Sequence, residues 1–471
     1  MIDRRSFIKA AGATFAALAL PDSANKLLCF AKNKLPKRPN IVFILADDLG
    51  FGDVGFNGSS IRTPNIDKLA AEGVRLNQFY VQPLCSPTRA CLMTGRYPIR
   101  YGLQVSVIRP WSDYGLPLTE RLLPQILKDA GYTTAICGKW HLGNCSPEYL
   151  PTHRGFDHQY GCYTGAIDYY KHIRNGALDW NRDDKSLVEE GYATDLIADE
   201  ATRLIQKQDI SKPLFLYVPF TAPHEPLQAQ DAYLQMYPDV KNYEKRNFAA
   251  MVTCLDNAVG KIIAALEKRK IRNDTLVIFC SDNGAVNGIG NNAPFRGHKA
   301  KLYEGGVRVP MVLSWPGVLD GDAIVKEPLH IVDMFPTLIK LAGAPVPQSP
   351  PIDGCDAWPT IAYGKPSPHD EILINATPFH AAIRRGNWKL IRNGNLTAQY
   401  PKLETKDNWF ELFNLDDDPG ERRNLIEHFP NKVEELKRRL DVYAAMAVQP
   451  KVSPAKMPRD FNAPRAWGHT D

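Results

Sequence analysis

The sequence predicts an α/β fold: a large mixed, mainly parallel sheet sandwiched by helices, followed by a smaller C-terminal antiparallel sheet packed with a helix. Three observations predict it. Across residues 36–345, short runs that are apolar at every position alternate with helix-like segments, which is typical of a parallel sheet buried on both faces. Across residues 369–450, short strand-like runs follow one another instead. A proline-rich stretch at residues 344–351 separates the two parts, and a chain of 471 residues is long for one core.

The elements of the first domain follow from hydrophobic periodicity, taken along the chain. Two apolar runs, at residues 40–45 and 275–280, each end in a pair of polar side chains and predict buried parallel strands. Further strands are expected at residues 74–80, 132–137, 213–219 and 311–314. The helical pattern is found at residues 64–73, 118–129, 192–206, 248–268 and 330–341. Residues 157–189 follow neither period and form a long excursion, a feature that is often a binding loop.

The second domain, residues 369–450, is predicted to be a small antiparallel sheet with one covering helix. Short strands are expected at residues 372–375, 381–385, 388–392 and 409–414, and the helix at 431–447. The proline-rich tail at residues 451–471 is expected to be loosely held.

The first 24 residues resemble a twin-arginine export signal. Arg4 and Arg5 precede an apolar run at residues 10–20, and small residues follow it. That run is about half of the ~20 residues that a spanning helix needs, so a processed signal is favoured over a stable membrane anchor. An amphipathic surface helix is the alternative. We therefore expect export by the twin-arginine machinery to a bacterial periplasm.

Composition argues against nucleic acid as a partner and indicates that at least one cysteine is unpaired. The net charge of +5 is small for this length and no long basic run occurs, so nucleic acid is not expected to bind. Nine cysteines are an odd number, so at least one is unpaired or chemically altered. We expect Cys85 to be that residue, and spacing alone does not fix any disulfide pairing.

The stretch Cys-Ser-Pro-Thr-Arg at residues 85–89 predicts a thiol at the start of a short helix. Ser86 suits the N-cap, Pro87 the first turn and Gly95 the C-terminal stop. Free backbone N–H groups and the helix dipole attract an anion there, and Arg89 can reach the same anion. The alternative is a buried thiol beside an ordinary helix cap.

Polar side chains at the strand ends predict a shared site. Asp47, Asp48, Asp282 and Asn283 follow the two similar strands and form an all-oxygen set, which favours Ca²⁺ and, less well, Mg²⁺. The alternative is that one pair caps a turn. Other strand-like runs end near Lys139, His141 and His224. Ligands bind beyond the carboxyl ends of such strands, so these groups are expected to converge.

These motifs together resemble the type I sulfatases of the alkaline phosphatase superfamily, in particular arylsulfatases and N-acetylgalactosamine sulfatases. The resemblance rests on residues 85–89 with Thr94 and Gly95, on the two acidic pairs and His224, and on residues 138–143, 299–310 and 411–421. It covers nearly everything after the signal. It implies an alkaline phosphatase-like fold and the hydrolysis of sulfate monoesters.

The resemblance also implies a modified nucleophile. Cys85 would be oxidised to formylglycine (3-oxoalanine) by a sulfatase-maturing enzyme, and would then also contact the metal. One hydroxyl of the hydrated aldehyde would attack sulfur and leave a covalent sulfate. The second hydroxyl would lose its proton and re-form the aldehyde with release of sulfate.

Roles for the surrounding residues are implied in the same way. Arg89 would hold the formylglycine, and Lys139 would bind its hydroxyls and the sulfate oxygens. His141 would be the base that drives sulfate release. His224 and Lys299 would hold the sulfate and assist the leaving oxygen. Lys299 is preferred to Lys301 by its spacing to Glu304.

The substrate is expected to be a sulfated oligo- or polysaccharide. Asp168, Tyr170, His172 and Arg174 lie in the long excursion, where rings and hydrogen-bonding groups would suit a sugar subsite. This segment resembles arylsulfatases that act on galactose-configured amino sugars. We expect exo-acting removal of sulfate from galactose or N-acetylgalactosamine.

Three other functions are compatible with some of these residues. The first is a phosphate or phosphonate ester hydrolase of the same superfamily. The second is a non-catalytic protein that binds sulfated glycans. The third is a thiol redox role for Cys85 and Cys91.

Overall fold

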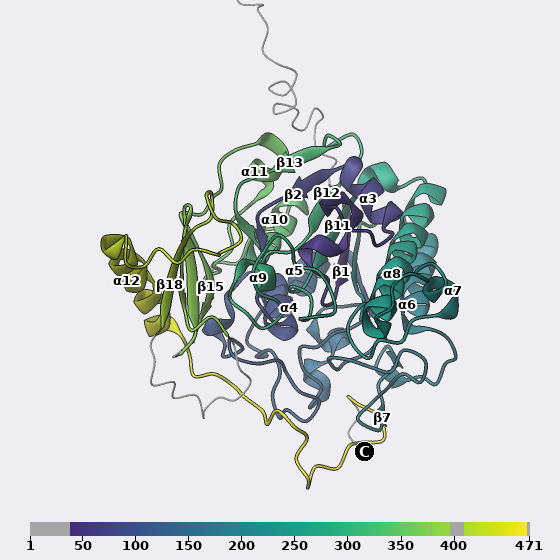
Figure 1. The fold of residues 1–471 in the computed structure, drawn as a ribbon. Coiled ribbons are helices and arrows are strands. Elements are labelled where there is room, and N and C mark those ends of the chain that lie inside the picture. The colour runs from purple at the N-terminus through teal and green to yellow at the C-terminus, as the bar shows by residue number, and fades with distance from the viewer. Residues whose placement is uncertain (1–37, 378, 396–408, 469–471) are drawn as a thin grey trace, which may run out of the picture.

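The computed structural model describes residues 38–377, 379–395 and 409–468 of the chain. The expected export signal at residues 1–24 lies outside these residues. The fold is built around one ten-stranded sheet with the order β13-β2-β12-β11-β1-β10-β4-β5-β8-β9. Figure 1 shows β13, β2, β12, β11 and β1 of this sheet, with helices around them. Its central strands are β1 (Asn40–Ala46), β10 (Leu214–Pro219), β11 (Thr275–Ser281) and β4 (Thr133–Cys137).

Parallel pairing dominates the centre of the sheet, and antiparallel pairing enters towards both of its edges. β1 pairs in parallel with both β10 and β11, and β4 lies parallel to β10. β12 (Met311–Ser314) runs antiparallel to β11 and to β2 (Val74–Leu76), beyond which lies β13 (Ala323–Val325). On the other side β4 pairs in parallel with β5 (His158–Gly161). Beyond β5 lie β8 (Asn181–Arg182) and β9 (Lys185–Ser186), which both pair antiparallel. The predicted mixed, mainly parallel sheet is confirmed.

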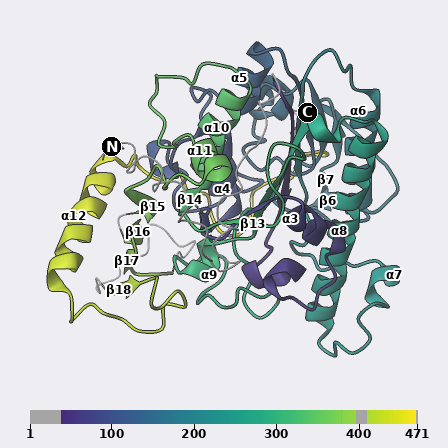
Figure 2. The same cartoon turned by 90° about the horizontal axis from the view of Figure 1, so that it is seen from above.

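Helices cover both faces, and alternate side chains of β1 separate the two cores. Ile41, Phe43 and Leu45 pack on the side of α4 (Cys85–Thr94), α5 (Leu123–Asp129) and α10 (Met334–Leu341). Val42 and Ile44 pack on the side of α3 (Pro64–Ala71), α6 (Ala193–Lys207) and α8 (Tyr243–Lys268). Figure 2 shows these two sets of helices on opposite sides of the sheet. Every residue of β1 is buried, which explains its continuous apolar run.

Several helices and strands begin or end at residues other than those predicted, for local reasons. The helix expected from residue 118 begins at Leu123, because Pro124 suits a first helical turn. The strand expected at residues 74–80 divides, and β3 (Phe79–Tyr80) leaves the large sheet to pair with β14 (Leu329–His330). α8 begins five residues early, because the Asn242 side chain accepts from the Lys245 N–H and caps it. By length and composition α8 could cross a membrane, but 78% of its apolar window is buried in the fold.

The smaller sheet has the order β15-β16-β17-β18, antiparallel throughout, with α12 (Pro430–Met446) packed against it. Its strands are β15 (Glu371–Ala376), β16 (Ala381–Arg385), β17 (Trp388–Arg392) and β18 (Phe410–Asn414). The tail differs from our expectation of a loosely held segment. Trp467 is 2% exposed, and its N–H donates to the Leu178 carbonyl (2.9 Å). The Lys451 N–H donates to the Gly102 carbonyl (2.8 Å), so residues 451–468 make specific contacts.

A buried ion network joins the smaller sheet to α9 (Glu304–Val307) and to β3. Lys389 Nζ of β17 lies 2.9 Å from Glu304 Oε1 and 2.8 Å from Glu421 Oε1, and all three side chains are fully buried. Tyr80 Oη also donates to Glu304 Oε2 (2.8 Å). Glu304 therefore serves the junction of α9, β3 and the smaller sheet, and not the strand-end site.

Replacing Lys389 by Ala is expected to lower the free energy of unfolding by about 3–5 kcal/mol, because two carboxylates lose their buried cation. Urea denaturation measures the change. The control is Lys340→Ala, which removes an exposed lysine paired with Asp356 and is expected to cost within about 0.5 kcal/mol. Equal losses in the two variants would contradict the role given to this network.

Candidate active site

The four oxygen-bearing side chains predicted at the strand ends lie together. Asp47 and Asp48 follow β1, and Asp282 and Asn283 follow β11, its parallel neighbour. The Asp48 N–H donates to Asp282 Oδ1 (3.2 Å), and Asn283 Nδ2 donates to Asp48 Oδ1 (2.7 Å). All four residues are buried. Adjacent parallel strands explain why positions over 230 residues apart meet at one edge of the sheet.

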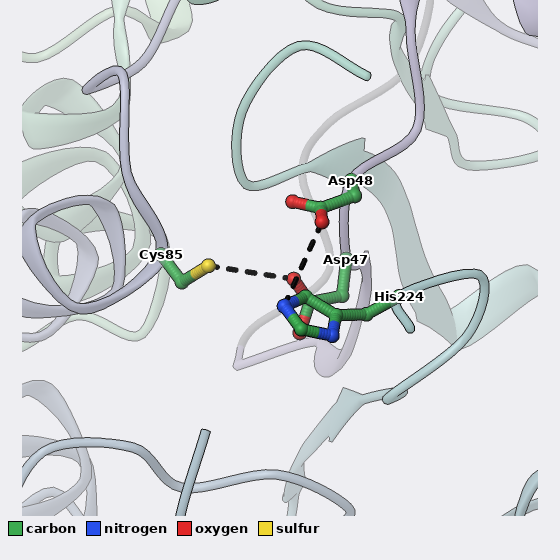
Figure 3. Close-up of side chains that lie close together, drawn as sticks. All are labelled: Asp47, Asp48, Cys85 and His224. Atoms are coloured by element: carbon green, nitrogen blue, oxygen red, sulfur yellow. Dashed lines mark hydrogen bonds and ion pairs between the residues drawn. The ribbon is translucent and has the colours of Figure 1, made fainter. Parts of the chain in front are cut away.

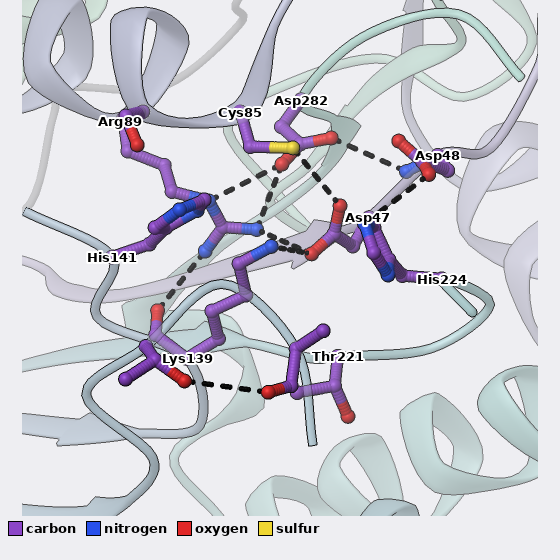
Figure 4. A network of polar contacts seen from close by, with 12 residues as sticks. Asp47, Asp48, Cys85, Arg89, Lys139, His141, Thr221, His224 and Asp282 are labelled. Carbon is purple, nitrogen blue, oxygen red and sulfur yellow. Dashed lines mark hydrogen bonds and ion pairs between the residues drawn. The ribbon is translucent and has the colours of Figure 1, made fainter. Parts of the chain in front are cut away.

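Arg89 connects these strand ends to α4 (Figure 4). Its Nη2 donates to Asp282 Oδ2 (2.8 Å) and Asp47 Oδ2 (3.3 Å), and its Nε also donates to Asp282 Oδ2 (3.2 Å). Nη1 donates to the Lys139 carbonyl (3.0 Å). The guanidinium is fully buried, so its planar fork fixes the helix against both strands.

Cys85 is the first residue of α4, where we predicted it just before the helix. Leu84 is the N-cap, and the prediction of Ser86 in that position is wrong. Ser86 Oγ instead accepts from the Ile108 N–H (3.1 Å) of a neighbouring loop. Gly95 ends the helix with φ 68°, as predicted. Cys85 Sγ donates to Asp47 Oδ1 (3.5 Å) and thus lies at the helix N-terminus beside the strand ends.

Lys139 and His141 follow β4 and both reach this region. Lys139 is fully buried and its Nζ pairs with Asp47 Oδ2. His141 Nε2 lies 3.0 Å from the Ile108 carbonyl. A carbonyl only accepts, so Nε2 carries the hydrogen and Nδ1 keeps a free lone pair. Nδ1 is buried and has no hydrogen-bond partner among the described residues.

Lys299 and His224 approach from the opposite side, at Asp48. Lys299 Nζ lies 2.8 Å from Asp48 Oδ2, and His224 Nε2 lies 3.6 Å from the same atom. His224 Nδ1 donates to the Glu225 carbonyl (2.7 Å). A cavity of about 190 Å³ opens between these groups. Its charged and reactive lining is Cys85, Arg109, His141, Arg174, His224, Glu225 and Lys299.

The buried carboxylates of Asp47 and Asp282 differ in pKa. Burial raises the pKa of Asp47, but the charges of Lys139, His224 and Arg89 outweigh it and hold that pKa well below its ordinary range. Burial and the neighbouring Asp47 raise the pKa of Asp282 to about 7, against the effect of Arg89. A further cation beside Asp282 would favour its ionised form.

Burial also sets the protonation of the other groups. It lowers the pKa of His141 well below its usual value, with Lys139 and Arg89 adding to the effect, so the imidazole is a neutral base. Burial lowers the pKa of Lys299 as well, but Asp48 and Cys85 outweigh it and keep the ammonium charged. Burial, and then Asp47, raise the pKa of the Cys85 thiol. The encoded thiol is therefore a poor nucleophile.

The oxygen-bearing cluster fits a divalent cation. Ligand atoms of Asp47, Asp48, Cys85 and His224 lie within 4.8 Å of one another (Figure 3). Asn283 Oδ1 is buried without a hydrogen-bond partner among the described residues, an orphaned acceptor that a cation would satisfy. Carboxylate and amide oxygens suit a hard cation such as Ca²⁺ or Mg²⁺. Asp47, Asp48, Asp282 and Asn283, with Cys85 beside them, could hold such an ion.

Known proteins are similar to this chain in sequence and in fold. Residues 39–344 match the sulfatase family, and residues 297–445 match the C-terminal family of N-sulphoglucosamine sulphohydrolase. The chain belongs to the sulfatase family. It is 37% identical to arylsulfatase J of Mus musculus, over 90% of this chain and 78% of that protein. It is 34% identical to N-acetylgalactosamine-6-sulfatase of Mus musculus, over 86% of each chain.

Solved structures agree with this assignment. The crystal structure of Ps i-CgsB in complex with k-i-k-neocarrahexaose is similar, with a TM-score of 0.80 and 33% identity. The similarity covers 88% of this sulfatase and 95% of that chain. The phosphonate monoester hydrolase of Agrobacterium radiobacter, at 20% identity and a TM-score of 0.62, shares the fold. This sulfatase is therefore a sulfuric ester hydrolase with the expected architecture.

The residues predicted to form a sugar subsite separate in the structure of this sulfatase. Only Arg174 of β6 (Ile173–Arg174) lines the cavity. The Asp168 carboxylate accepts from the N–H groups of Tyr170 and Lys171 and from Gln228, so it shapes the loop. His172 is 1% exposed and stacks on Trp180, 4.5 Å between ring centroids. His172 therefore supports the excursion from inside, against our expectation that it contacts the sugar. The role of Asp168 in a sugar subsite stays a prediction.

Tyr170 is 48% exposed and lies against Tyr192, outside the cavity wall of the sulfatase. Arg109 and Glu225 line the cavity and were missed from sequence. Glu225 adjoins His224 and could have been found by that proximity. Arg109 lies in an irregular loop, where no periodicity or motif marks it.

Proposed function

We propose that this sulfatase removes sulfate from sulfated glycans, acting in exo mode on galactose or N-acetylgalactosamine sulfate. One observation carries the proposal of catalysis. Cys85, His141, His224 and Lys299 line a single cavity at the N-terminus of α4, beside the oxygen cluster. A binding protein would need the cations, but it would not need a buried neutral base next to a candidate nucleophile.

Cys85 is the proposed nucleophile position, after conversion to formylglycine by a sulfatase-maturing enzyme. Cys85 Sγ stands where an oxygen of the matured residue would lie, 3.5 Å from Asp47 Oδ1. When present, the hydrated aldehyde supplies two hydroxyls, one to attack sulfur and one whose deprotonation releases sulfate. Arg89 fixes this end of α4 through Asp47 and Asp282, so it positions the nucleophile.

His141 and the cations take the remaining roles. His141 Nδ1 has a free lone pair and accepts the hydroxyl proton that is lost during sulfate release. Lys139 and Lys299 hold the sulfate oxygens by charge, because negative charge develops there during the reaction. His224 faces Asp48 and assists the leaving oxygen. Burial, and then the charge of Lys299, lower the pKa of His224. The negative charge of a bound sulfate would act in the opposite direction, toward the protonated form that this role requires.

Ca²⁺ is the proposed metal, with Mg²⁺ the weaker candidate. Asp47, Asp48, Asp282 and Asn283 would hold it, and Ca²⁺ accepts such a flexible set of oxygen ligands. The bound ion supplies a positive charge that favours an ionised nucleophile and a negative transition state.

The glycan assignment rests on the relatives and on sequence. The relatives include an N-acetylgalactosamine-6-sulfatase, and a related structure holds k-i-k-neocarrahexaose. We further propose that residues 1–24 direct export through the twin-arginine machinery to the periplasm, where polysaccharide substrates are met.

Purified protein is expected to hydrolyse an aryl sulfate faster than the matching aryl phosphate. His141→Gln is expected to lower kcat by roughly 10²–10⁴, because the proton acceptor is lost. The acid limb of the wild-type kcat profile should lie below pH ~6.5, since a lowered pKa keeps the base neutral to lower pH.

His428→Gln is the control, because His428 is exposed on the smaller domain and its replacement should leave kcat unchanged. Faster phosphate turnover would favour the phosphate or phosphonate esterase instead. Absence of both activities in the matured protein would favour the non-catalytic glycan-binding function.

Chelator-treated protein is expected to melt at a higher temperature when Ca²⁺ is restored. At a free Ca²⁺ concentration of one hundred times Kd, the free energy of unfolding should rise by about 2.7 kcal/mol. Mg²⁺ should stabilise less. Asp48→Asn and Asn283→Ala should each weaken the effect. Asp199→Asn is the control, since Asp199 pairs with Lys261 on the surface. An equal Ca²⁺ response in all variants would place the ion elsewhere.

A further inference from the structure

Two arginines line the cavity without taking part in the reaction proposed above. Arg109 lies in the loop between η3 (Pro98–Arg100) and α5, and Arg174 lies in β6 of the long excursion. Both line the cavity that contains Cys85 and Lys299. The chain therefore brings two guanidinium groups from distant segments to one wall of the site.

Neither guanidinium has an acidic partner in the described part of the chain. No ion pair or side-chain hydrogen bond forms at Arg109 or Arg174 there, and the Nε atom of each is buried without a partner. Burial lowers the pKa of Arg174, and the charge of Glu225, which lines the same cavity, only partly opposes this effect; the two side chains form no ion pair. The Asp179 carboxylate is occupied by the N–H groups of Tyr163 and Thr164.

Placing these two cations together is unfavourable by itself. Burial, and then the charge of Arg174, lower the pKa of Arg109, and burial lowers that of Arg174. Partly buried guanidinium groups that lack hydrogen-bond acceptors cost free energy. An anion between them would offset both the repulsion and the unmade hydrogen bonds.

The C-terminal tail holds both arginines in place. Trp467 Nε1 donates to the Arg174 carbonyl (2.8 Å). Ser112 Oγ accepts from the Arg109 N–H (2.8 Å) and lies 2.7 Å from Ser453 Oγ of the tail. A segment that we expected to be loose thus fixes the two loops that carry the unpartnered cations.

We propose that Arg109 and Arg174 form a subsite for a second anionic group on the substrate, distinct from the sulfate that is removed. This proposal rests on the proposed function and narrows its substrate class. The planar fork of a guanidinium matches the oxygens of a sulfate ester or a carboxylate. The preferred substrate is then a sulfated sugar that carries a second sulfate or adjoins a uronate.

The test compares kcat/KM of the matured full-length enzyme on four substrates. These are an aryl monosulfate, a galactose or N-acetylgalactosamine monosulfate, the same sugar with a second sulfate, and the monosulfated sugar linked to a uronate. Wild type should prefer one or both of the last two, and that preference identifies the second anion.

Arg109→Ala and Arg174→Ala should each lower kcat/KM for the preferred substrate by roughly tenfold to a hundredfold, which is the effect of losing a charge-assisted hydrogen bond. Both should lower the aryl monosulfate rate far less, because that substrate has no second anionic group. Lys171→Ala is the control, because Lys171 is an exposed cation of the same excursion and its loss should affect no substrate. Trp467→Phe, which removes the donor to the Arg174 carbonyl, should raise KM for the preferred substrate only.

An equal loss on all four substrates would overturn the proposal, because the arginines would then serve the sulfate under attack. An unchanged preference in both arginine variants would also overturn it. If wild type hydrolyses no sulfate ester, the proposed function fails separately. Calorimetric binding of the disulfated and monosulfated sugars to wild type and Arg109→Ala still tests the subsite, and equal affinities would reject it.

Discussion

Two carboxylates buried at the ends of neighbouring strands, Asp47 and Asp282, dictate the rest of the site. Removing such charges from water is unfavourable unless cations and hydrogen bonds accompany them. Arg89 meets this requirement by contacting both carboxylates with one planar group. Because Arg89 lies one turn into α4, the same contacts fix the start of that helix. The ion pairs that neutralise the two carboxylates therefore also hold Cys85 beside the strand ends.

The charges around this network also explain why the cavity favours an anion. Three carboxylates follow β1 and β11, and three cations contact them: Arg89, Lys139 and Lys299. The described ion network is thus balanced before any metal binds. A divalent cation would leave it positive, and a sulfate monoester would then restore part of the balance. The neutral imidazole of His141 adds a base without adding charge. The same site therefore offers cations to an anion and a neutral base to a proton.

Sequence predicted the parts of this site that local pattern controls. Apolar runs ending in Asp47 and Asp282 indicated parallel strands, and the parallel register then brought their ends together. Predictions from the sequence failed where contacts between distant segments determine the role of a side chain. Ser86 looked like an N-cap, but a loop 22 positions away uses its hydroxyl. His172 looked like a sugar ligand, but stacking on Trp180 buries it. Arg109 follows no motif, and the tail is ordered by contacts that proline content does not reveal.

The proposed reaction requires Cys85 to act as something other than a cysteine, since burial leaves the encoded thiol protonated and weakly nucleophilic. Mass spectrometry of the peptide containing residue 85, on fractions of differing specific sulfatase activity, tests this most directly. Activity is expected to rise in proportion to the fraction of chains that carry the aldehyde in place of the thiol. Full sulfatase activity in protein whose Cys85 is entirely unmodified would contradict it.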